Sequence, residues 1–442
     1  MTDAKSYLRR LSDDIVALHK PLKVLRLLRW APRVHARFFA QKARRLPEVT
    51  YPPLDFDPRE VARSFAALRR RIRGRNAVEA LLRAKCDEGA SLAGMLAARG
   101  TKAFYEHSVR IYGHPRDAFA AQPQVDNLKV AELWAGRPPS SVAGPLLSSA
   151  QAVDLVRALV APYLGSACSV RESSRLTANA AAGPRSVLVR KGATFTPRQA
   201  RALAHHEGLW HVLTSLNGFR QPVLTVLGIG LPGHTESQEG GGVVSEFLTE
   251  SISDERYREL GARTLAVDMA ASGADYLQVF HFLAERFGPH KAAQMSERVF
   301  RGGLLTGGAP FTKDAVYQRG YCRTYSFLRA ALAMPEPGLL EAFLCGKMRV
   351  DDAPLIRQLI EEGLCIGPTY RPEWLLDRES LMAKVTHSIT ISRFSVARSR
   401  RYYEERAARA VRARRGEPGA RNRCSPVRSA RAASGEEEES GD

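Results

Sequence analysis

The stretch that decides the fold runs from residue 205 to residue 222 and reads HHEGLWHVLTSLNGFRQP. In it His206 and His211 bracket Glu207, and a further carboxylate, Glu239, follows about one helix-turn-helix length later. Two imidazoles and one carboxylate form the ligand set of a catalytic zinc site that keeps one position open for water. Glu207 would lie beside that water as its general base. The sequence therefore predicts a zinc site on His206, His211 and Glu239.

The spacing of the two histidines restricts the helix that carries them. They are five positions apart, and at roughly 100° per residue an ideal α-helix would place them about 140° apart. One extra residue taken up as a π-bulge would bring both rings to one side, and such bulges are frequent at functional sites. Gly208 lies between the histidines and lowers the cost of this distortion. The alternative is a regular helix with incidental histidines.

Local patterns place this segment on a helix that follows a strand. Residues 196–199 form a capping-box pattern with a proline at the first helical position, and Asn217-Gly218 is a helix stop signal. Residues 186–191 read as a strand. Two interpretations of this strand stay open. It is either an edge strand that can pair with an extended peptide substrate, or part of an edge hairpin with residues 168–171.

Glu239 is expected on a second helix. A further capping-box pattern begins at Thr235, and this start would put Glu239 in the first helical turn. Residues 240–242 are three glycines, which are poor helix formers. In the functional interpretation, their missing side chains leave room beside the metal. If the helix instead began after these glycines, Glu236 and Glu246 would be the substitute ligands.

These motifs resemble those of the microtubule-associated tyrosine carboxypeptidase family, whose bacterial branch is described as QEGLA-motif, flavohaemoglobin-expression-modulating proteins. The resemblance rests on the histidine segment, on residues 217–222 and on Gln238-Glu239-Gly240. Weaker likenesses lie at residues 54–58, 99–101, 112–113 and 311–320, so the resemblance extends from about residue 50 to about residue 375.

The resemblance implies a reaction and its residues. The reaction is removal of a C-terminal residue from a peptide or protein tail, with tyrosine removed in the eukaryotic members. One zinc ion would be bound by His206, His211 and Glu239, with Glu207 as the catalytic base. Two departures from the family pattern affect the shape of the pocket and put the substrate in doubt. Gly208 comes earlier than the family's glycine, and Gly241-Gly242 replace the leucine-alanine of QEGLA.

Hydrolysis at a chain end also needs a second donor for the oxyanion and a cation for the terminal carboxylate. By residue type alone, the candidates near the motifs are Arg220, His234, Lys313, Tyr317 and Arg319. Because the chain has 66 lysines and arginines, any one of these cations is more often a solvated surface charge.

Composition sets the remaining expectations. The net charge of +20 attracts polyanions such as an acidic peptide tail, although an arginine- and alanine-rich composition explains the same charge. No nucleic-acid-binding motif is present, so we expect no specific nucleic-acid partner. There is no run of 18 apolar residues for a transmembrane helix, and the charged N-terminus lacks a secretory signal. Six scattered cysteines suit a reducing cytoplasm.

We expect an α+β fold, a predominantly α-helical zinc-peptidase-like domain with a small β-sheet flanking the active-site helix. Residues 1–50 would form a basic helical extension that packs on the domain or lies on a membrane surface. Residues 51–165 would be the helical N-terminal part of the catalytic unit, residues 166–394 the metallopeptidase core, and residues 395–442 a charged tail, disordered past Arg415. The alternative function is an altered family member that acts as a binding or regulatory protein, and a third is hydrolysis of another amide.

Overall fold

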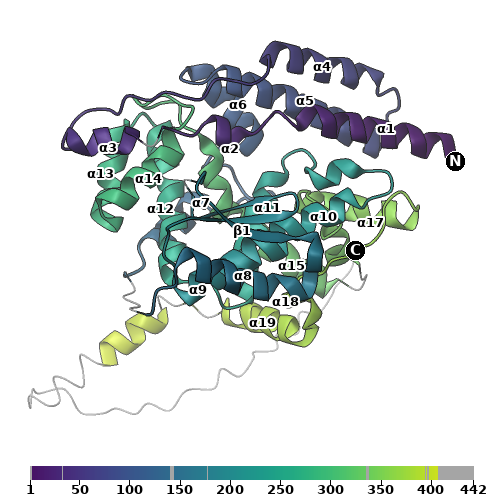
Figure 1. The fold of residues 1–442 in the computed structure, drawn as a ribbon. Helices are drawn as coiled ribbons and strands as arrows, with labels where there is room; N and C mark the ends of the chain where they lie inside the picture. The colour runs from purple at the N-terminus through teal and green to yellow at the C-terminus, as the bar shows by residue number, and fades with distance from the viewer. Residues whose placement is uncertain are drawn as a thin grey trace, which may run out of the picture. The chain divides into compact units, whose positions relative to one another are not determined.

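The computed structural model describes residues 2–31, 33–139, 144–176, 178–334, 338–393, 395 and 398–406 (Figure 1). The chain divides into two compact units, Met1–Met382 and Ala383–Asp442. The first unit is mostly helical and contains one three-stranded sheet. The predicted α+β, predominantly helical fold is therefore confirmed. The expectation of a disordered tail past Arg415 lies outside the described residues.

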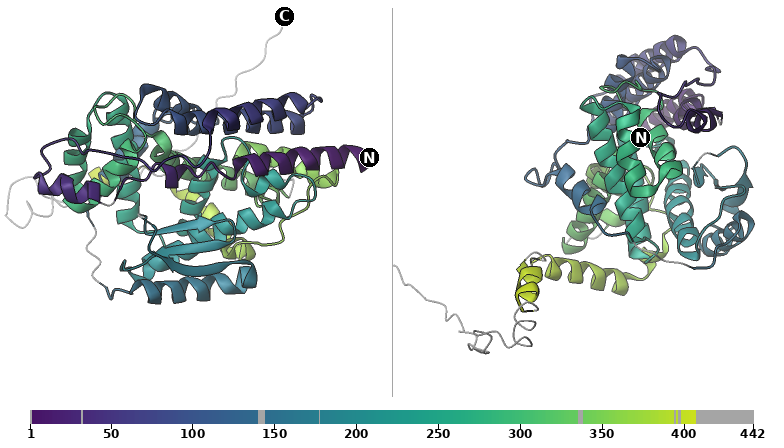
Figure 2. Two further views of the ribbon diagram at one scale, coloured as in Figure 1. Left: turned by 45° about the horizontal axis from the view of Figure 1, so that its top comes forward. Right: turned by 90° about the vertical axis from the view of Figure 1, so that its left-hand side faces the viewer.

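The N-terminal extension packs on the domain. It forms α1 (Thr2–His19), α2 (Val24–Leu27) and α3 (Arg33–Ala40). α1 runs beside α4 and α5 (Figure 2), and its residues Leu11 and Ile15 are fully buried. Trp30 and Phe38 contact Tyr276 of a later helix in one aromatic core. Of the two expectations for this extension, the structure supports packing on the domain.

Five helices precede the sheet, as the sequence predicts for this region. They are α4 (Pro58–Arg71), α5 (Ala77–Ala97), α6 (Lys102–Tyr112), α7 (Asn127–Ala135) and α8 (Ser149–Leu164). Capping boxes start α5 at Asn76 and α8 at Ser148, where the cap side chain and the third helical residue satisfy each other's main-chain N–H groups. The buried valines of α8 then pack against the sheet.

The strand at residues 186–191 is not an edge strand, as both interpretations had it, but it does pair with residues 169–171, in parallel and not as a hairpin. The strands of the sheet are β1 (Ser169–Ser173), β2 (Ala180–Gly183) and β3 (Ser186–Arg190), in the order β1-β3-β2. β3 is the central strand, parallel to β1 and antiparallel to β2. It offers no free edge to a substrate, because the chain folds back through β2 and fills the second edge. Val187 and Val189 of β3 are fully buried in the same core as α8.

The histidine helix begins where the sequence predicts. It is built from α9 (Pro197–Leu203), a π-helical segment η2 (Ala204–Val212) and α10 (Leu213–Phe219), and Thr196 with Gln199 forms the expected capping box. The predicted stop at Asn217-Gly218 is wrong by two residues. Asn217 uses its side-chain amide to bind the main chain of Leu344 and Tyr370 instead of ending the helix.

The helix that carries Glu239 starts earlier than expected. α11 (His234–Leu248) is capped by Gly233 in the left-handed region at φ 68°, and the Gly233 N–H donates to Glu88. The expected Thr235 cap does not form, and Glu239 lies in the second turn. The alternative start after Gly242 is also wrong. α11 packs closely on α15 (Val316–Ala333), where Gly240 meets Gly320.

The remaining elements are all helical. α12 (Asp254–Ala271) and α13 (Tyr276–Phe287) are separated by a break at residues 272–275. The others are α14 (Pro289–Phe300), α16 (Leu339–Phe343), α17 (Ala353–Glu361), α18 (Glu373–Leu376), α19 (Arg378–Ile391) and the short η1 (Gly165–Ala167), η3 (Thr225–Gly228), η4 (Thr312–Ala315) and η5 (Val350–Asp352). Within the described residues, no helix has the length and apolarity to cross a membrane.

Candidate metal centre

The widened turn brings the two histidines together. In the π-helical segment the Leu213 N–H donates to the carbonyl of Gly208, five residues earlier. Residues five apart therefore lie on one side of the helix. The rings of His206 and His211 have centroids 4.9 Å apart and are inclined at 75°. The predicted π-bulge is confirmed, and the alternative of a regular helix is wrong.

Glu239 of α11 completes a three-residue cluster. One ligand atom each of His206, His211 and Glu239 lies within 4.8 Å of the others. The Oε2 atom of Glu239 is 3.6 Å from the Nε2 atom of each histidine. Two donors of one tetrahedral zinc ion, bound at roughly 2.0–2.2 Å, lie about 3.3–3.6 Å apart. The donor set and the separations of Glu239 from the two histidines therefore fit a single zinc ion.

The far sides of both imidazoles are held by acceptors. The Nδ1 atom of His206 is 2.7 Å from Glu246, whose carboxylate also accepts from Arg256. The Nδ1 atom of His211 is 3.3 Å from the side-chain oxygen of Gln238. An imidazole that donates from Nδ1 presents the lone pair of Nε2, and such outer partners orient metal-binding histidines. Glu246 is thus a partner of a ligand and not a substitute ligand.

The electrostatics of the cluster favour a cation. Burial alone would lower the pKa of His206, but the carboxylates of Glu239 and Glu246 outweigh it and raise this pKa to about 10. Burial would raise the pKa of Glu239, yet Lys313 and the two histidines hold it well below its usual range. The centre therefore stabilises positive charge at the His206 imidazole and negative charge at Glu239, and such a negative potential attracts a metal cation.

Glu207, the predicted base, is half-buried next to His206. Within the part of the chain that the structure describes, its carboxylate has neither a hydrogen bond nor an ion pair. Its charge nevertheless acts on the imidazole of His206. An unpaired carboxylate beside a metal ligand is free to accept a proton from a bound water.

The three glycines after Glu239 make room for groups of the centre. A Cβ atom on Gly242 would lie 2.5 Å from Cε1 of His206, and one on Gly241 would lie 2.0 Å from Cζ2 of Trp210. Gly240 faces the main chain of Gly320. The space beside the metal that the sequence predicts is therefore filled by rings and by a neighbouring helix.

Two of the five predicted substrate residues come to the centre. Lys313, which is buried, contacts Oε1 of Glu239 at 2.5 Å, and its ammonium is 3.3 Å from the Tyr317 hydroxyl. The Tyr317 ring is also faced by Arg263, 4.7 Å from its centroid. Because Lys313 already pairs with Glu239, its place in the structure is that of a partner of a metal ligand.

The other three candidates have different partners and contact none of the metal ligands among the described interactions. Arg319 donates to Glu236 and to main-chain carbonyls of the loop after α6. His234 is bonded through Nδ1 to a carbonyl, and burial, with help from a nearby lysine, lowers its pKa to about 3. Arg220 is exposed and donates to Thr369. Glu236 is engaged by Arg319 and Arg323 and is not a ligand.

A cleft of about 150 Å³ opens one helical turn from Glu239. Its lining comes from the end of α6, the start of α11 and the first turns of α15, and includes Tyr112, Glu236, Val316, Arg319, Arg323 and Arg349. Glu236 and Glu239 are three residues apart on α11 and therefore share a helix face. The cleft thus lies next to Glu239 along α11, although none of the three candidate ligands is among its lining residues.

Sequence reasoning missed two contributors to the site. Asp314, which is fully buried, accepts a two-pronged bond from Arg298 beside Tyr317. Lys347 lies on a segment distant in sequence, and the charges of Glu239 and Glu207 act on it. Asp314 adjoins Lys313 and could have been singled out with it. Nothing in the local pattern around Lys347 distinguishes it from other lysines.

The fold and the site together define a predominantly helical α+β protein with a buried candidate metal centre of two histidines and one glutamate. A family model described as microtubule-associated tyrosine carboxypeptidase matches residues 36–393. The chain belongs to this family, which is a family of peptidases. The match confirms the resemblance drawn from the motifs and extends it at both ends. No curated protein matches the chain.

Proposed function

We propose that the protein is a zinc-dependent carboxypeptidase that removes the C-terminal residue from a peptide or protein tail. The observation that carries this proposal is the convergence of His206, His211 and Glu239, with the unpaired carboxylate of Glu207 beside them. Membership of a carboxypeptidase family supports the reaction class. The sheet has no free edge at β3, so substrate binding by strand addition to β3 is not part of the proposal.

The residues of the chain would divide the work as follows. Glu246 and Gln238 orient the two imidazoles, and Lys313 orients Glu239. When bound, zinc supplies a Lewis acid for the scissile carbonyl and lowers the pKa of water. Glu207 accepts the proton of the attacking water and passes it to the leaving amine.

The cleft beside Glu239 would receive the side chain of the residue that is removed. An engineered apolar cavity of about 150 Å³ admits a benzene ring, so the cleft has the size for an aromatic side chain. Tyr112 and Val316 provide apolar walls, and the arginines of its lining provide donors for a phenol hydroxyl. This size and lining support tyrosine as the terminal residue, in line with the description of the family.

The setting of the reaction is also part of the proposal. An acidic tail as substrate is supported by the net charge of +20. A cytoplasmic location is supported by the five cysteines in the described residues, all of which are free thiols.

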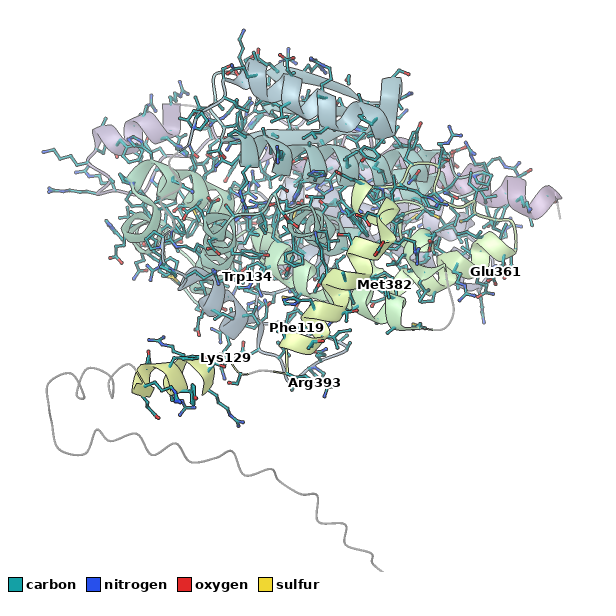
Figure 3. All side chains as sticks on the ribbon, turned by 90° about the horizontal axis from the view of Figure 1, so that it is seen from below. Phe119, Lys129, Trp134, Glu361, Met382 and Arg393 are labelled. Atoms are coloured by element: carbon teal, nitrogen blue, oxygen red, sulfur yellow. The ribbon has the colours of Figure 1, made fainter. Side chains whose placement is uncertain are left out.

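The test replaces Glu207 with glutamine, which keeps the shape of the side chain and removes its basicity. We expect Glu207→Gln to bind one zinc per chain and to lose hydrolysis by roughly 10²–10⁴-fold. The matched control is Glu361→Gln at an exposed position of α17 (Figure 3), which should keep full activity. Amino-acid release from a peptide library and metal content are measured for both variants.

Full activity of Glu207→Gln with zinc present would eliminate the proposed base. A wild-type protein that binds zinc but releases no amino acid from the library would instead support the alternative, a binding or regulatory protein.

A further inference from the structure

Lys347 is a lysine to which the proposed mechanism gives no role. It is half-buried in the segment between α16 and η5. Across the residues that the structure describes, its ammonium group has no hydrogen bond and no ion pair. The other cations near the centre differ in this respect, since Lys313 pairs with Glu239 and Arg319 pairs with Glu236.

The main chain of Lys347 is fixed to the metal-binding part of the fold. Its N–H donates to the carbonyl of Leu227 at 2.8 Å, and its carbonyl accepts from the N–H of Leu231 at 2.9 Å. A Cβ atom on Gly346 would lie 2.6 Å from the Cβ atom of Leu227 and 3.2 Å from the Cα atom of Gly218. The segment therefore packs directly on the end of the histidine helix.

Two amides of that helix hold the same segment. The side chain of Asn217 donates to the carbonyl of Leu344 at 2.8 Å, and that of Gln221 donates to the carbonyl of Cys345 at 3.1 Å. All three amide and glycine contacts come from residues 217–221, directly after the histidines. The position of Lys347 relative to the metal ligands is thus set by an ordered hydrogen-bond network.

The two functional carboxylates act on the ammonium of Lys347. Burial lowers its pKa to about 8, and the charges of Glu239 and Glu207 act in the opposite direction. Two residues further along the chain, Arg349 lines the cleft next to Glu236. The segment that carries Lys347 therefore joins the end of the histidine helix to the cleft.

Once a metal ion is bound at the centre, the positive charge of the Lys347 ammonium is no longer balanced by nearby negative charge. A metal ion bound to Glu239 takes up much of the charge of that carboxylate, and Glu207 must remain free to accept a proton. A partly buried ammonium with no partner is unfavourable, and an anion that reaches it is bound through charge-assisted hydrogen bonds. The substrate of a carboxypeptidase carries one such anion, its terminal carboxylate.

We propose that Lys347 is the residue that binds the terminal carboxylate of the substrate and thereby selects chain ends. This inference rests on the proposed function. It replaces Arg220, Lys313 and Arg319, the cations near the motifs in sequence, with one that is distant in sequence and free of partners. The terminal side chain enters the cleft while its carboxylate meets Lys347.

The test measures binding without turnover. In the zinc-loaded Glu207→Gln protein, fluorescence anisotropy compares a labelled pool of octapeptides that end in tyrosine with the same pool carrying a C-terminal amide. With Lys347 intact, we expect the acid to bind about 10–100-fold tighter than the amide. Lys347→Met should abolish this preference by weakening the acid alone, and Lys347→Arg should restore part of it.

The control is Lys129→Met, at an exposed position of α7 (Figure 3), which should leave the preference unchanged. Zinc content and circular dichroism confirm that each variant is folded, and Lys347→Gln takes the place of Lys347→Met if the latter does not fold. A retained preference for the acid in the Lys347 variants, an equal loss for acid and amide, or no binding of either pool by the parent protein would overturn the inference.

Amino-acid release by the protein with Glu207 intact is measured in parallel and separates the two proposals. Binding that prefers the acid and depends on Lys347, without release of any amino acid, would leave the carboxylate site in place and refute the hydrolase. Release of amino acids together with an acid preference that does not depend on Lys347 would support the hydrolase and refute the carboxylate site at Lys347.

Discussion

The close approach of α11 and α15 is predicted to control metal affinity. A Cβ atom on Gly240 would lie 2.0 Å from the carbonyl carbon of Gly320 and 2.2 Å from its oxygen. Carbon atoms in contact lie about 3.5 Å apart, so Gly240→Ala must open the seam by about 1.5 Å. The atoms that obstruct it belong to main chain, which leaves no flexible side chain to move aside.

The opening is larger than the metal centre can absorb. Glu239 directly precedes Gly240, and its Oε2 atom is 3.6 Å from each histidine Nε2 atom. Two donors of one tetrahedral zinc ion lie about 3.3–3.6 Å apart, so the present separation leaves almost no slack. Lys313 lies in η4, the short helix directly before α15, so opening the seam would also stretch its contact with Glu239. We expect Gly240→Ala to weaken zinc binding by about tenfold or more.

Zinc affinity is measured by competition with a chromophoric chelator, and folding by circular dichroism and urea denaturation. Stability alone is a poor readout, because overpacking costs about 1–3 kcal/mol while alanine gains about 1 kcal/mol over glycine within a helix. Gly320→Ala, whose Cβ atom would lie 2.1 Å from the carbonyl oxygen of Glu236, should act in the same direction. Gly144→Ala, which meets no atom within 4 Å, is the control. Zinc binding by Gly240→Ala that equals the wild type would refute the reasoning.

Two further predictions concern stability. Burial would raise the pKa of Asp314, but Arg298 and a second arginine outweigh this effect and lower the pKa. The ionised carboxylate therefore stabilises the fold above about pH 4, the ordinary aspartate pKa. This stabilisation is lost as the pH falls further. Urea denaturation at pH 7 should show Asp314→Asn destabilised by about 3–5 kcal/mol, because the buried Arg263 and the half-buried Arg298 lose their common partner. The difference from wild type should narrow in acid, and a constant difference would contradict this. Asn217→Ala removes three hydrogen bonds to main chain and should lower the free energy of unfolding by about 2–4 kcal/mol. A change below about 0.5 kcal/mol would show that these hydrogen bonds do not stabilise the fold.

The motif residues determined the metal centre to a large extent. The five-residue spacing of His206 and His211 could bring two rings together only through a widened turn, and the structure contains that turn. The capping box at Thr196 also forms as its pattern predicts. Local rules succeed here because both features depend on backbone geometry and on partners within a few residues.

The errors have a common cause in distant partners. The α11 helix begins at His234 and not after the Thr235 pattern, because Glu88 of α5 binds the main chain at Gly233. The side chain of Asn217 donates a hydrogen bond to the main chain of a segment more than 120 positions away, and Asn217 does not end its helix. The central place of β3 depends on which strands pair on its two sides. None of these partners can be read from the residues near the pattern.

The sequence by itself determined the widened turn that unites the histidines, the residues of the candidate metal cluster and the mostly helical class of the fold. Only the tertiary structure decided which charges serve the site. In the folded chain Lys313 forms an ion pair with Glu239 and Arg319 forms one with Glu236, whereas the Lys347 ammonium has no partner among the described residues. The physical reason is that the number of ligands and their spacing are local properties of the chain. The partner of a buried charge is instead chosen by whichever segments the packed core brings within a few ångströms.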